Sequence, residues 1–435
     1  MNDGLILADR IAQPEMQEVK KVQQYVKFEA VDARRGQIKI TNSYDFRSLD
    51  GLGLAWQVIE DGRMSQGGKL PAPKLAAGKS EVVSLPIRSV KPGTEAFLSV
   101  SVHLAENETW APPGHGVAWE QFELQQPALP STNRPAGEVK LTESGNGFVV
   151  TGEDFRVGFD QNGALSSYQW QGAELLASGL RPNLWRVPTD NDEGGGERSF
   201  ASRWRQAGLD QLSAKVQEVK GEQLGAGEAR VSSVLVLTGK KGTITYRATY
   251  SVAADGAIAL QSDFKSDGDW PPLPKVGVQL QLPGQFTDVE WYGRGPHESY
   301  WDRKTGARVD TYRGKAAEMH FLQVNPQESG NRSDVRWVQL TNASGIGLEV
   351  SGEGLFNFTV HDYTDQALME AKKTQEIVRD GKITLSLDLQ QMGLGGDDSW
   401  SPRTHPQYLL TAKDYSFVLN FKPATKNGDT LVMRL

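Results

Sequence analysis

The sequence contains no cysteine in its 435 residues. Disulfide bonds, thiolate metal sites and cysteine nucleophiles are therefore excluded together, and this absence fits a reducing or an oxidising compartment. The sequence also lacks any run of about 18 apolar residues, so it predicts neither a transmembrane helix nor a membrane partner. It opens with Met1-Asn2-Asp3-Gly4, which is not a signal-peptide pattern. We expect a soluble chain, cytoplasmic or periplasmic, and leave the compartment open because a signal peptide would lie upstream.

A basic excess is missing as well. The chain has 47 Lys and Arg residues against 54 Asp and Glu residues, a formal net charge of −7. The charges are spread along the sequence, so no basic stripe is present that would neutralise a run of phosphates, and we expect no nucleic-acid partner. Hydrophobic residues make up 38% and charged residues 23%, as in ordinary globular proteins. At about 150 residues per domain, the length predicts two or three domains.

Turn-forming and large aromatic residues are abundant, with 46 Gly, 21 Pro and 11 Trp. Together they favour many short strands, so the predicted fold class is all-β. One short helix is expected over residues 14–24, where Pro14 precedes early acidic and late basic residues. From residue 25 the apolar period drops to two, as at Leu54, Trp56 and Val58, which predicts an immunoglobulin-like β-sandwich over 25–125. The proline-rich residues 126–139 are interpreted as a linker.

Residues 140–435 contain no second linker and are predicted to form one large antiparallel unit. Turn signals Asn162-Gly163 and Asp255-Gly256 indicate hairpins. Residues 183–205 are interpreted as an unusually long loop, and long loops in compact domains are often functional. The expected strands include residues 148–159, 231–237, 243–252, 257–264 and 276–282.

The loops of this large unit carry dense polar and aromatic clusters. Sugar recognition needs planar side chains for ring faces and carboxylates, amides or guanidinium groups for hydroxyls, and these clusters supply both. Ordinary turn formation explains Asp, Asn, Gly and Pro equally well. The clusters are RPNLWRVPTDNDEGGG (181–196), WYGRGPHESYWDRKTG (291–306), NPQESGNRSDVRW (325–337), HDYTDQALMEA (361–371) and MGLGGDDSWSPRTHP (392–406).

In that order, the clusters resemble the C-terminal portion of large β-galactosidases of glycoside hydrolase family 2. The resemblance covers almost the entire chain. It implies that residues 1–24 are the tail of a catalytic (β/α)8 barrel, that 25–125 are the fourth, sandwich domain, and that 140–435 are the fifth domain. The fifth domain of that family is a large antiparallel supersandwich of galactose mutarotase-like fold.

The resemblance places the catalytic machinery outside this segment. Family members hydrolyse terminal β-D-galactose residues by a retaining double displacement, which needs two carboxyl groups. Both glutamates, and the Mg ion with a possible Na ion, belong to the barrel. We therefore expect no catalytic residue, metal ligand or cofactor in this segment, and no activity from it alone. The implied partners are a β-galactoside and an N-terminal catalytic portion or separate large subunit, with a homo-oligomer when intact.

One residue carries over into the family's active site. The motif GGDDSW spans Gly395–Trp400, and the family projects its tryptophan to the barrel mouth, so Trp400 is predicted to bind substrate. Asp397 and Asp398 are expected mainly to shape the loop through hydrogen bonds to its backbone. Thr189–Asp192 offer oxygen atoms for a hard cation, but helix capping and turn formation explain them as well.

A second, weaker candidate is the GPHESYWDR stretch. His297 and Glu298 form an adjacent acid and base pair, although neighbours on a strand would point to opposite faces. Arg294, Asp302 and Arg303 are expected to form an internal ion-pair network.

Two other functional classes remain open. An independent aldose epimerase would need a histidine acid and a carboxylate base facing one sugar. A carbohydrate-binding module would rest on Trp400 and the aromatic residues of the loops. The residues available for the epimerase are His297, His361, Glu298, Glu328 and Glu370.

Overall fold

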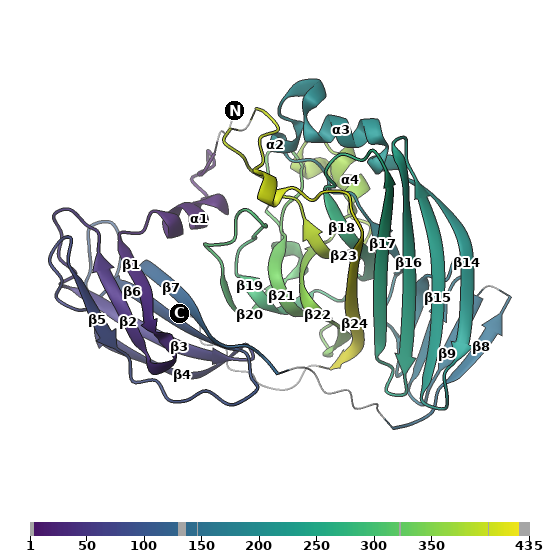
Figure 1. Cartoon of the computed structure of the whole chain (residues 1–435), viewed down its shortest axis with the longest axis horizontal. Coiled ribbons are helices and arrows are strands. Elements are labelled where there is room, and N and C mark those ends of the chain that lie inside the picture. The colour runs from purple at the N-terminus through teal and green to yellow at the C-terminus, as the bar shows by residue number, and fades with distance from the viewer. Residues whose placement is uncertain (1–3, 129–135, 146, 322, 399, 426–435) are drawn as a thin grey trace. The chain divides into compact units, whose positions relative to one another are not determined.

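The computed structural model of the chain describes residues 4–128, 136–145, 147–321, 323–398 and 400–425. These residues divide into two units (Figure 1). The sandwich unit comprises residues 4–128 and 305–311, and the large unit comprises the described residues of 136–304 and 312–425. The predicted linker, 126–139, falls partly outside the described residues.

The sandwich unit contains one α-helix and two antiparallel sheets. The helix predicted over 14–24 is present as α1 (Glu15–Val22), with Pro14 at its N-cap. The sheets have the orders β1-β2-β5 and β4-β3-β6-β7. Their strands are β1 (Val26–Asp32), β2 (Gln37–Asn42), β3 (Leu52–Glu60), β4 (Arg63–Pro71), β5 (Ser80–Ser84), β6 (Ala96–Leu104) and β7 (Gly116–Gln125).

The core of the sandwich follows the period-two pattern of the sequence. Leu54, Trp56 and Val58 of β3 are buried, while the residues between them are half-buried. Trp56 lies opposite Val100 of β6, and both side chains join one hydrophobic cluster. Alternation therefore fixes which face of β3 points inward, because a register shift of one residue would expose this whole set.

The large unit has its own hydrophobic core and most of the strands. Its strands, in chain order, are β8 (Lys140–Ser144), β9 (Gly147–Thr151), β10 (Phe155–Phe159), β11 (Leu165–Trp170), β12 (Ala173–Glu174), β13 (Ser178–Asn183), β14 (Ser213–Gln223), β15 (Glu228–Thr238), β16 (Gly242–Ala253), β17 (Ile258–Gly268), β18 (Lys275–Pro283), β19 (Asp288–Gly295), β20 (Arg308–Lys315), β21 (Arg332–Thr341), β22 (Ile346–His361), β23 (Lys382–Gln391) and β24 (Tyr415–Thr425). The first half of β20, residues 308–311, is assigned to the sandwich unit.

These strands form two antiparallel sheets. The smaller sheet has the order β12-β11-β10-β9-β8. The larger has the order β13-β18-β23-β22-β24-β17-β16-β15-β14, with β19 to β21 joined through β22 (Figure 1). Strand β22 changes partner along its length, pairing with β24 at residues 346–352 and with β23 at residues 357–361. The prediction of an all-β fold is confirmed.

Most predicted strands and both predicted hairpins are confirmed. Asn162-Gly163 lies in the turn between β10 and β11, and Asp255-Gly256 in the turn between β16 and β17. Both glycines have positive φ values, 72° and 83°, which a side chain would disfavour. The single strand predicted over 148–159 is wrong, because Gly152 begins a tight turn that separates β9 from β10.

The expectation of a single helix and of an irregular loop over 183–205 is also wrong. This segment contains α2 (Asp190–Glu193) and α3 (Phe200–Ala207), and α4 (Asp365–Glu370) lies further along the chain. The side chain of Ser199 caps α3, which buries Phe200 and Trp204 one turn apart. Caps and one apolar stripe are sufficient for a short helix that packs on a core.

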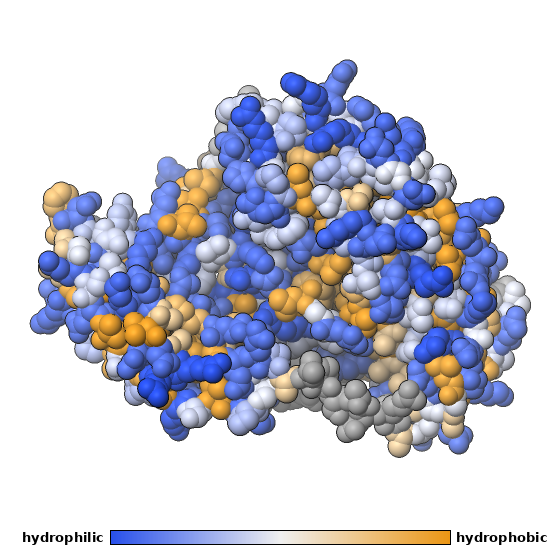
Figure 2. Space-filling model, viewed as in Figure 1, coloured by the Kyte–Doolittle hydropathy of each residue, from blue (hydrophilic) through white to orange (hydrophobic). Residues whose placement is uncertain are grey.

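Hydrophilic side chains predominate on the face of the molecule shown in Figure 2, with apolar ones in small separate patches. Isolated apolar side chains are normal on protein surfaces. Within the described residues, no helix has the length and apolar character needed to cross a membrane.

Candidate functional site

Trp400 is among the most exposed large hydrophobic side chains that the structure describes, with 73% of its surface accessible. It lies between β23 and β24, in a segment that we call the Trp400 loop (residues 392–403, with 399 outside the described residues). An indole that stays this exposed adds little to the core of its own unit. It is therefore available to a ligand or to another part of a protein.

Buried and half-buried side chains hold the beginning of the Trp400 loop. The Arg186 guanidinium donates from Nη1 to the Met392 carbonyl (2.5 Å) and from Nη2 to that of Gly393 (3.2 Å). Asp302 Oδ2 accepts a hydrogen bond of 2.7 Å from the Gly395 amide. Charged partners make these hydrogen bonds stronger than neutral ones. The base of the loop is thus fixed by two ionic side chains.

Two glycines permit the close approach of this loop to its supports. A Cβ atom on Gly393 would lie 2.8 Å from the carboxylate carbon of Asp302, and one on Gly396 would lie 2.6 Å from the Arg403 carbonyl oxygen. Such separations are below van der Waals contact. Gly393 is therefore explained by close packing against Asp302, and Gly396 by the close approach of the Arg403 backbone within the loop itself.

Arg186 itself is held by a fully buried ion pair. It donates to both carboxylate oxygens of Asp192, at 2.7 and 3.2 Å, and the two side chains are 0% and 2% exposed. Asp192 also completes a capping box with Thr189 at the start of α2. Capping thus accounts for the Thr189–Asp192 stretch. No three His, Asp or Glu side chains within the described residues are grouped as metal ligands.

Of the two aspartates expected to shape the Trp400 loop, Asp398 bonds to the loop backbone, whereas Asp397 contacts a histidine side chain instead. Asp398 Oδ1 accepts hydrogen bonds from Ser401 Oγ (2.6 Å) and from the Trp400 amide (3.1 Å). The bond from Ser401 contributes most to lowering the pKa of Asp398. Asp397 Oδ1 lies 2.8 Å from His405 Nε2. Asp398 therefore binds the backbone on which Trp400 is mounted.

His297 and Glu298 lie after the end of β19, in a segment that is not a strand. The argument that neighbours on a strand point to opposite faces therefore does not apply to them. Glu298 is buried, forms an ion pair with Arg303 and accepts a 2.7 Å hydrogen bond from the Gly330 amide. Burial raises its pKa to about 7. His297 is half-buried, and burial together with the positive charge of Arg332 lowers its pKa to about 4. The geometry gives Glu298 a structural task.

The predicted ion-pair network of Arg294, Asp302 and Arg303 is only partly correct. Arg294 Nε lies 2.5 Å from Asp334 Oδ2, and Arg303 pairs with Glu298. Asp302 instead binds backbone in the Trp400 loop. The sequence did not identify the partners of these three residues, which are Asp334 on β21, Glu298 in the segment after β19 and the Gly395 amide of the Trp400 loop.

A buried ionic cluster in the large unit was not anticipated from the sequence. Lys275 Nζ lies 3.4 Å from Asp388 Oδ2, and Gln391 Nε2 donates to Asp388 (3.3 Å) and Glu328 (3.4 Å). Burial raises the pKa of Glu328 and of Asp388 to about 7. The sequence did contain a signal for this cluster: Lys275 and Asp388 each lie in a predominantly apolar strand, β18 and β23. A charge buried in such a strand needs a partner of opposite charge.

Comparison with known proteins connects this geometry to a family. The model for the β-galactosidase small chain matches residues 151–421, and the model for β-galactosidase domain 4 matches residues 38–125. The chain belongs to the β-galactosidase small chain family. The resemblance to the C-terminal portion of β-galactosidases is thereby confirmed.

The relatives of this family member are longer than the chain. The β-galactosidase of Priestia megaterium (strain DSM 319 / IMG 1521) is 33% identical over 429 residues, which cover 97% of this chain and 41% of the relative. That of Vibrio vulnificus (strain CMCP6) is 32% identical over 440 residues, covering 98% and 42%. The chain thus spans about two fifths of the length of these relatives.

The solved structures that match this chain include proteins named as epimerases. A putative aldose 1-epimerase from Escherichia coli K12 is 8% identical, with a TM-score of 0.37, over 66% of this chain and 100% of its own. The galactose 1-epimerase of Lactobacillus acidophilus NCFM is 9% identical, with a TM-score of 0.33, over 67% and 100%.

Proposed function

We propose that this chain acts as the non-catalytic C-terminal segment of a β-galactosidase and supplies Trp400 to the rim of its active site. The observation that carries the proposal is an exposed tryptophan on a firmly anchored loop, in a chain that matches β-galactosidases over part of their length. A second task of the segment is to support assembly of the whole enzyme, which we expect to be a homo-oligomer.

The division of labour follows from the chemistry of glycoside hydrolysis. A retaining enzyme needs a general acid and a nucleophile, with carboxyl groups about 5–5.5 Å apart on the two sides of the scissile bond. We assign both groups, and the Mg ion with a possible Na ion, to the portion of the relatives that this chain does not match. The partners are then a β-galactoside and that catalytic portion, either fused or as a separate subunit.

An indole suits the remaining task of placing the sugar. Its flat apolar face can stack on the C–H groups of a sugar ring or of the leaving group without taking part in proton transfer. The anchors at Arg186 and Asp302 fix the loop backbone before substrate arrives, which lowers the entropy cost of binding. Trp400 is therefore a substrate-binding residue, and Asp397 and Asp398 are positioning residues.

A complementation experiment tests the proposal. The purified chain is assayed for hydrolysis of nitrophenyl β-D-galactoside alone, and then together with the unmatched N-terminal portion of the Priestia megaterium β-galactosidase. We expect no turnover from either part and measurable turnover from the mixture or from a single fused chain. Hydrolysis by the chain alone would contradict the assignment of the carboxyl groups. Polarimetry on α-D-galactose tests mutarotation, and a rate above that of buffer would favour an epimerase.

The role of Trp400 is tested in the active fusion. Losing one stacking face costs about 1–2 kcal/mol, so Trp400→Ala should lower kcat/KM about five- to thirtyfold, whereas Trp400→Phe should recover part of it. The matched control is Trp110→Ala, since Trp110 is also exposed (58%) but lies in the sandwich unit. Equal effects of the two alanine variants would remove Trp400 from the site.

A further inference from the structure

The buried ionic cluster next to the Trp400 loop contains more negative than positive groups. Lys275 is 1% exposed, and it faces the carboxyl groups of Asp388 (0%) and Glu328 (5%). Two buried carboxyl groups thus share one ammonium group. A buried charge without a partner is strongly unfavourable, so the cluster is balanced when one of the two carboxyl groups carries a proton.

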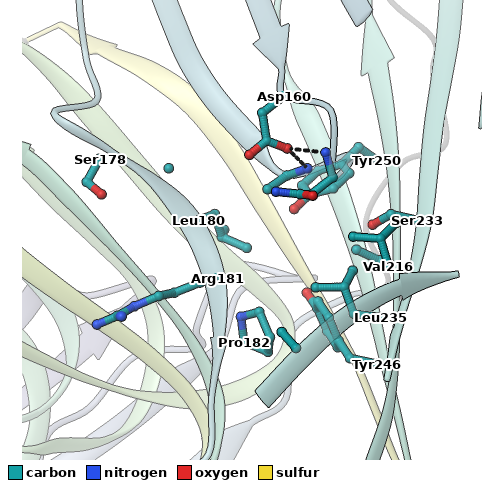
Figure 3. Close-up of a pocket in the computed structure, with 15 residues that line it drawn as sticks. Asp160, Ser178, Leu180, Arg181, Pro182, Val216, Ser233, Leu235, Tyr246 and Tyr250 are labelled. Atoms are coloured by element: carbon teal, nitrogen blue, oxygen red, sulfur yellow. Dashed lines mark hydrogen bonds between the residues drawn. The ribbon is translucent and has the colours of Figure 1, made fainter. Parts of the chain in front are cut away.

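The other ionic side chains around the cluster are already paired. Arg186 also faces the cluster, but it donates to both carboxylate oxygens of Asp192. Asp365 of α4 accepts a 3.0 Å hydrogen bond from Gln279 Nε2. Arg181 lines the cavity drawn in Figure 3, but its guanidinium extends away from the tyrosines there and donates to Gln279 Oε1 (2.6 Å). Arg181 and Asp365 therefore lie on the two sides of one amide, and their charges offset each other.

The remaining titratable groups near the cluster are paired or neutral. Glu298 forms an ion pair with Arg303. Burial lowers the pKa of His361, so its imidazole is uncharged at neutral pH. Burial raises the pKa of the Tyr300 and Tyr363 phenols, which therefore keep their protons. Within the part of the chain that the structure describes, these groups add no second cation to the cluster.

The hydrogen bonds of Gln391 indicate the same missing proton. Its Nε2 has two hydrogens for three acceptors, which are Asn331 Oδ1 (3.1 Å), Asp388 Oδ2 (3.3 Å) and Glu328 Oε1 (3.4 Å). Gln391 Oε1 and Asp388 Oδ1 are buried acceptors with no hydrogen-bond partner among the described residues. A protonated carboxyl group has an O–H that donates, whereas a carboxylate only accepts. One proton shared by Glu328 and Asp388 therefore adds a donor to a group that has too few.

Gln391 connects this cluster to the Trp400 loop through the backbone. It is the last residue of β23, and the loop begins with the next residue, Met392. The Met392 amide donates to the carbonyl of Pro274 (2.9 Å), the neighbour of Lys275, and the Met392 carbonyl accepts the hydrogen bond from Arg186. A displacement of Gln391 or of Lys275 therefore reaches the first residue of the loop directly.

We propose that Gln391 is a positioning residue for the Trp400 loop, and that one proton shared by Glu328 and Asp388 controls where its amide is held. When the proton is lost, two carboxylates compete for the Gln391 amide and for the Lys275 ammonium, and the start of the loop shifts with them. The two carboxyl groups titrate as a pair, and burial raises the pKa of each to about 7, so the proton is lost in the neutral range. This inference rests on the proposed function, because it concerns the delivery of Trp400 to substrate.

The pH dependence of the Trp400 contribution tests the proposal in the active fusion. The contribution is the ratio of kcat/KM between the fusion and its Trp400→Ala variant, in which the titration of the catalytic carboxyl groups cancels. We expect this ratio to fall about threefold or more between about pH 6 and about pH 8, because a displaced loop presents the indole poorly. In Glu328→Gln, which has no proton to lose, the ratio should stay constant. Gln391→Met removes the amide at similar size, so its ratio should be low and constant.

Hydrogen exchange of the chain alone gives a second readout that needs no turnover. The amides of Met392 and Gly393 donate to the carbonyls of Pro274 and Tyr408, each at 2.9 Å. After correction for the intrinsic exchange rate at each pH, the protection of these amides should fall between about pH 6 and about pH 8. That fall should be absent from Glu328→Gln.

Two further variants complete the test. Asp388→Asn removes the other carboxyl group, and it replaces Glu328→Gln in both measurements if that variant does not fold. The control is Glu349→Gln on β22, where Glu349 pairs with Lys422 (2.9 Å), and it should keep the pH dependence of the parent. A large Trp400 ratio that does not change with pH overturns the shared proton and leaves the proposed function standing. So does an equal pH dependence in the parent and in Glu328→Gln. A ratio close to unity at every pH instead overturns the role of Trp400, and hydrogen exchange then decides the shared proton.

Discussion

The buried pair of Arg186 and Asp192 offers a sharp test of how the Trp400 loop is held. Replacing Arg186 with methionine removes the charge that Asp192 faces and the donors to two loop carbonyls. Breaking a fully buried pair by removing one partner costs about 3–5 kcal/mol, since the remaining charge stays in an apolar surrounding. We therefore expect Arg186→Met to lower the free energy of unfolding of the large unit by about 3–5 kcal/mol.

A neighbouring pair provides the control. Arg205 pairs with Glu193, the residue next to Asp192, at 2.5 Å, but both side chains are 46% exposed. An exposed pair contributes about 0–1 kcal/mol, so Arg205→Met should change the free energy of unfolding by less than about 1 kcal/mol. Adding Asp192→Asn to Arg186→Met should recover part of the loss, because asparagine removes the stranded charge and keeps an oxygen for the α2 cap.

The assay is urea unfolding followed by tryptophan fluorescence, which reports mainly on the large unit because most of the 11 tryptophans belong to it. Midpoints are compared at a common m-value. If Arg186→Met and Arg205→Met lose equal stability, burial does not set the strength of these pairs and the reasoning fails.

Three further predictions concern the large unit. Because burial raises the pKa of Glu328 and Asp388 to about 7, the native state holds more protons than the unfolded state above about pH 4. Stability should therefore fall as pH rises towards 7, by at most about 3 kcal/mol for Glu328 and about 4 kcal/mol for Asp388. Glu328→Gln should flatten that fall in urea titrations at several pH values, and an unchanged slope contradicts the assignment. Leu260→Ala, at a fully buried position, should cost about 2–5 kcal/mol in the same assay; a loss below about 1 kcal/mol would mean that the core refills the space. Tyr168→Phe removes the 2.6 Å hydrogen bond to the Gly256 carbonyl and should cost about 1–3 kcal/mol; a stability equal to that of the parent would show that this carbonyl finds another donor.

The sequence predicted the features that depend on local pattern. Alternation along β3 and the turn at Asn162-Gly163 both act over a few residues, so a window of sequence contains the whole cause. The failures at 148–159 and at α3 are also local. There, the turn residues Gly152, Glu153 and Asp154 separate two short apolar segments, and a capped helix of eight residues was hidden among turn-forming residues.

Long-range pairing could not be predicted in this way. The partners of Arg186 lie in α2 and more than 200 residues further along, in the Trp400 loop. The cluster similarly joins Lys275 of β18 and Asp388 of β23 to Glu328, which lies in the segment before β21. Composition and hydrophobic periodicity also did not single out Trp400, which was predicted from its place in the family motif GGDDSW. The structure adds that Trp400 is exposed and that Asp398 binds its backbone amide.

The position of β24 has a consequence for how the large unit forms during synthesis. This strand lies between β17 and β22, so it joins two parts of the larger sheet that are otherwise not adjacent. Until residues 415–425 have left the ribosome, the edges of β17 and β22 have no strand to bind, and such edges promote aggregation. The larger sheet is therefore completed only after all of its other strands have been synthesised. The pairing of β24 with β17 and β22 is the closing step, and it is a long-range contact that forms long after the first strand.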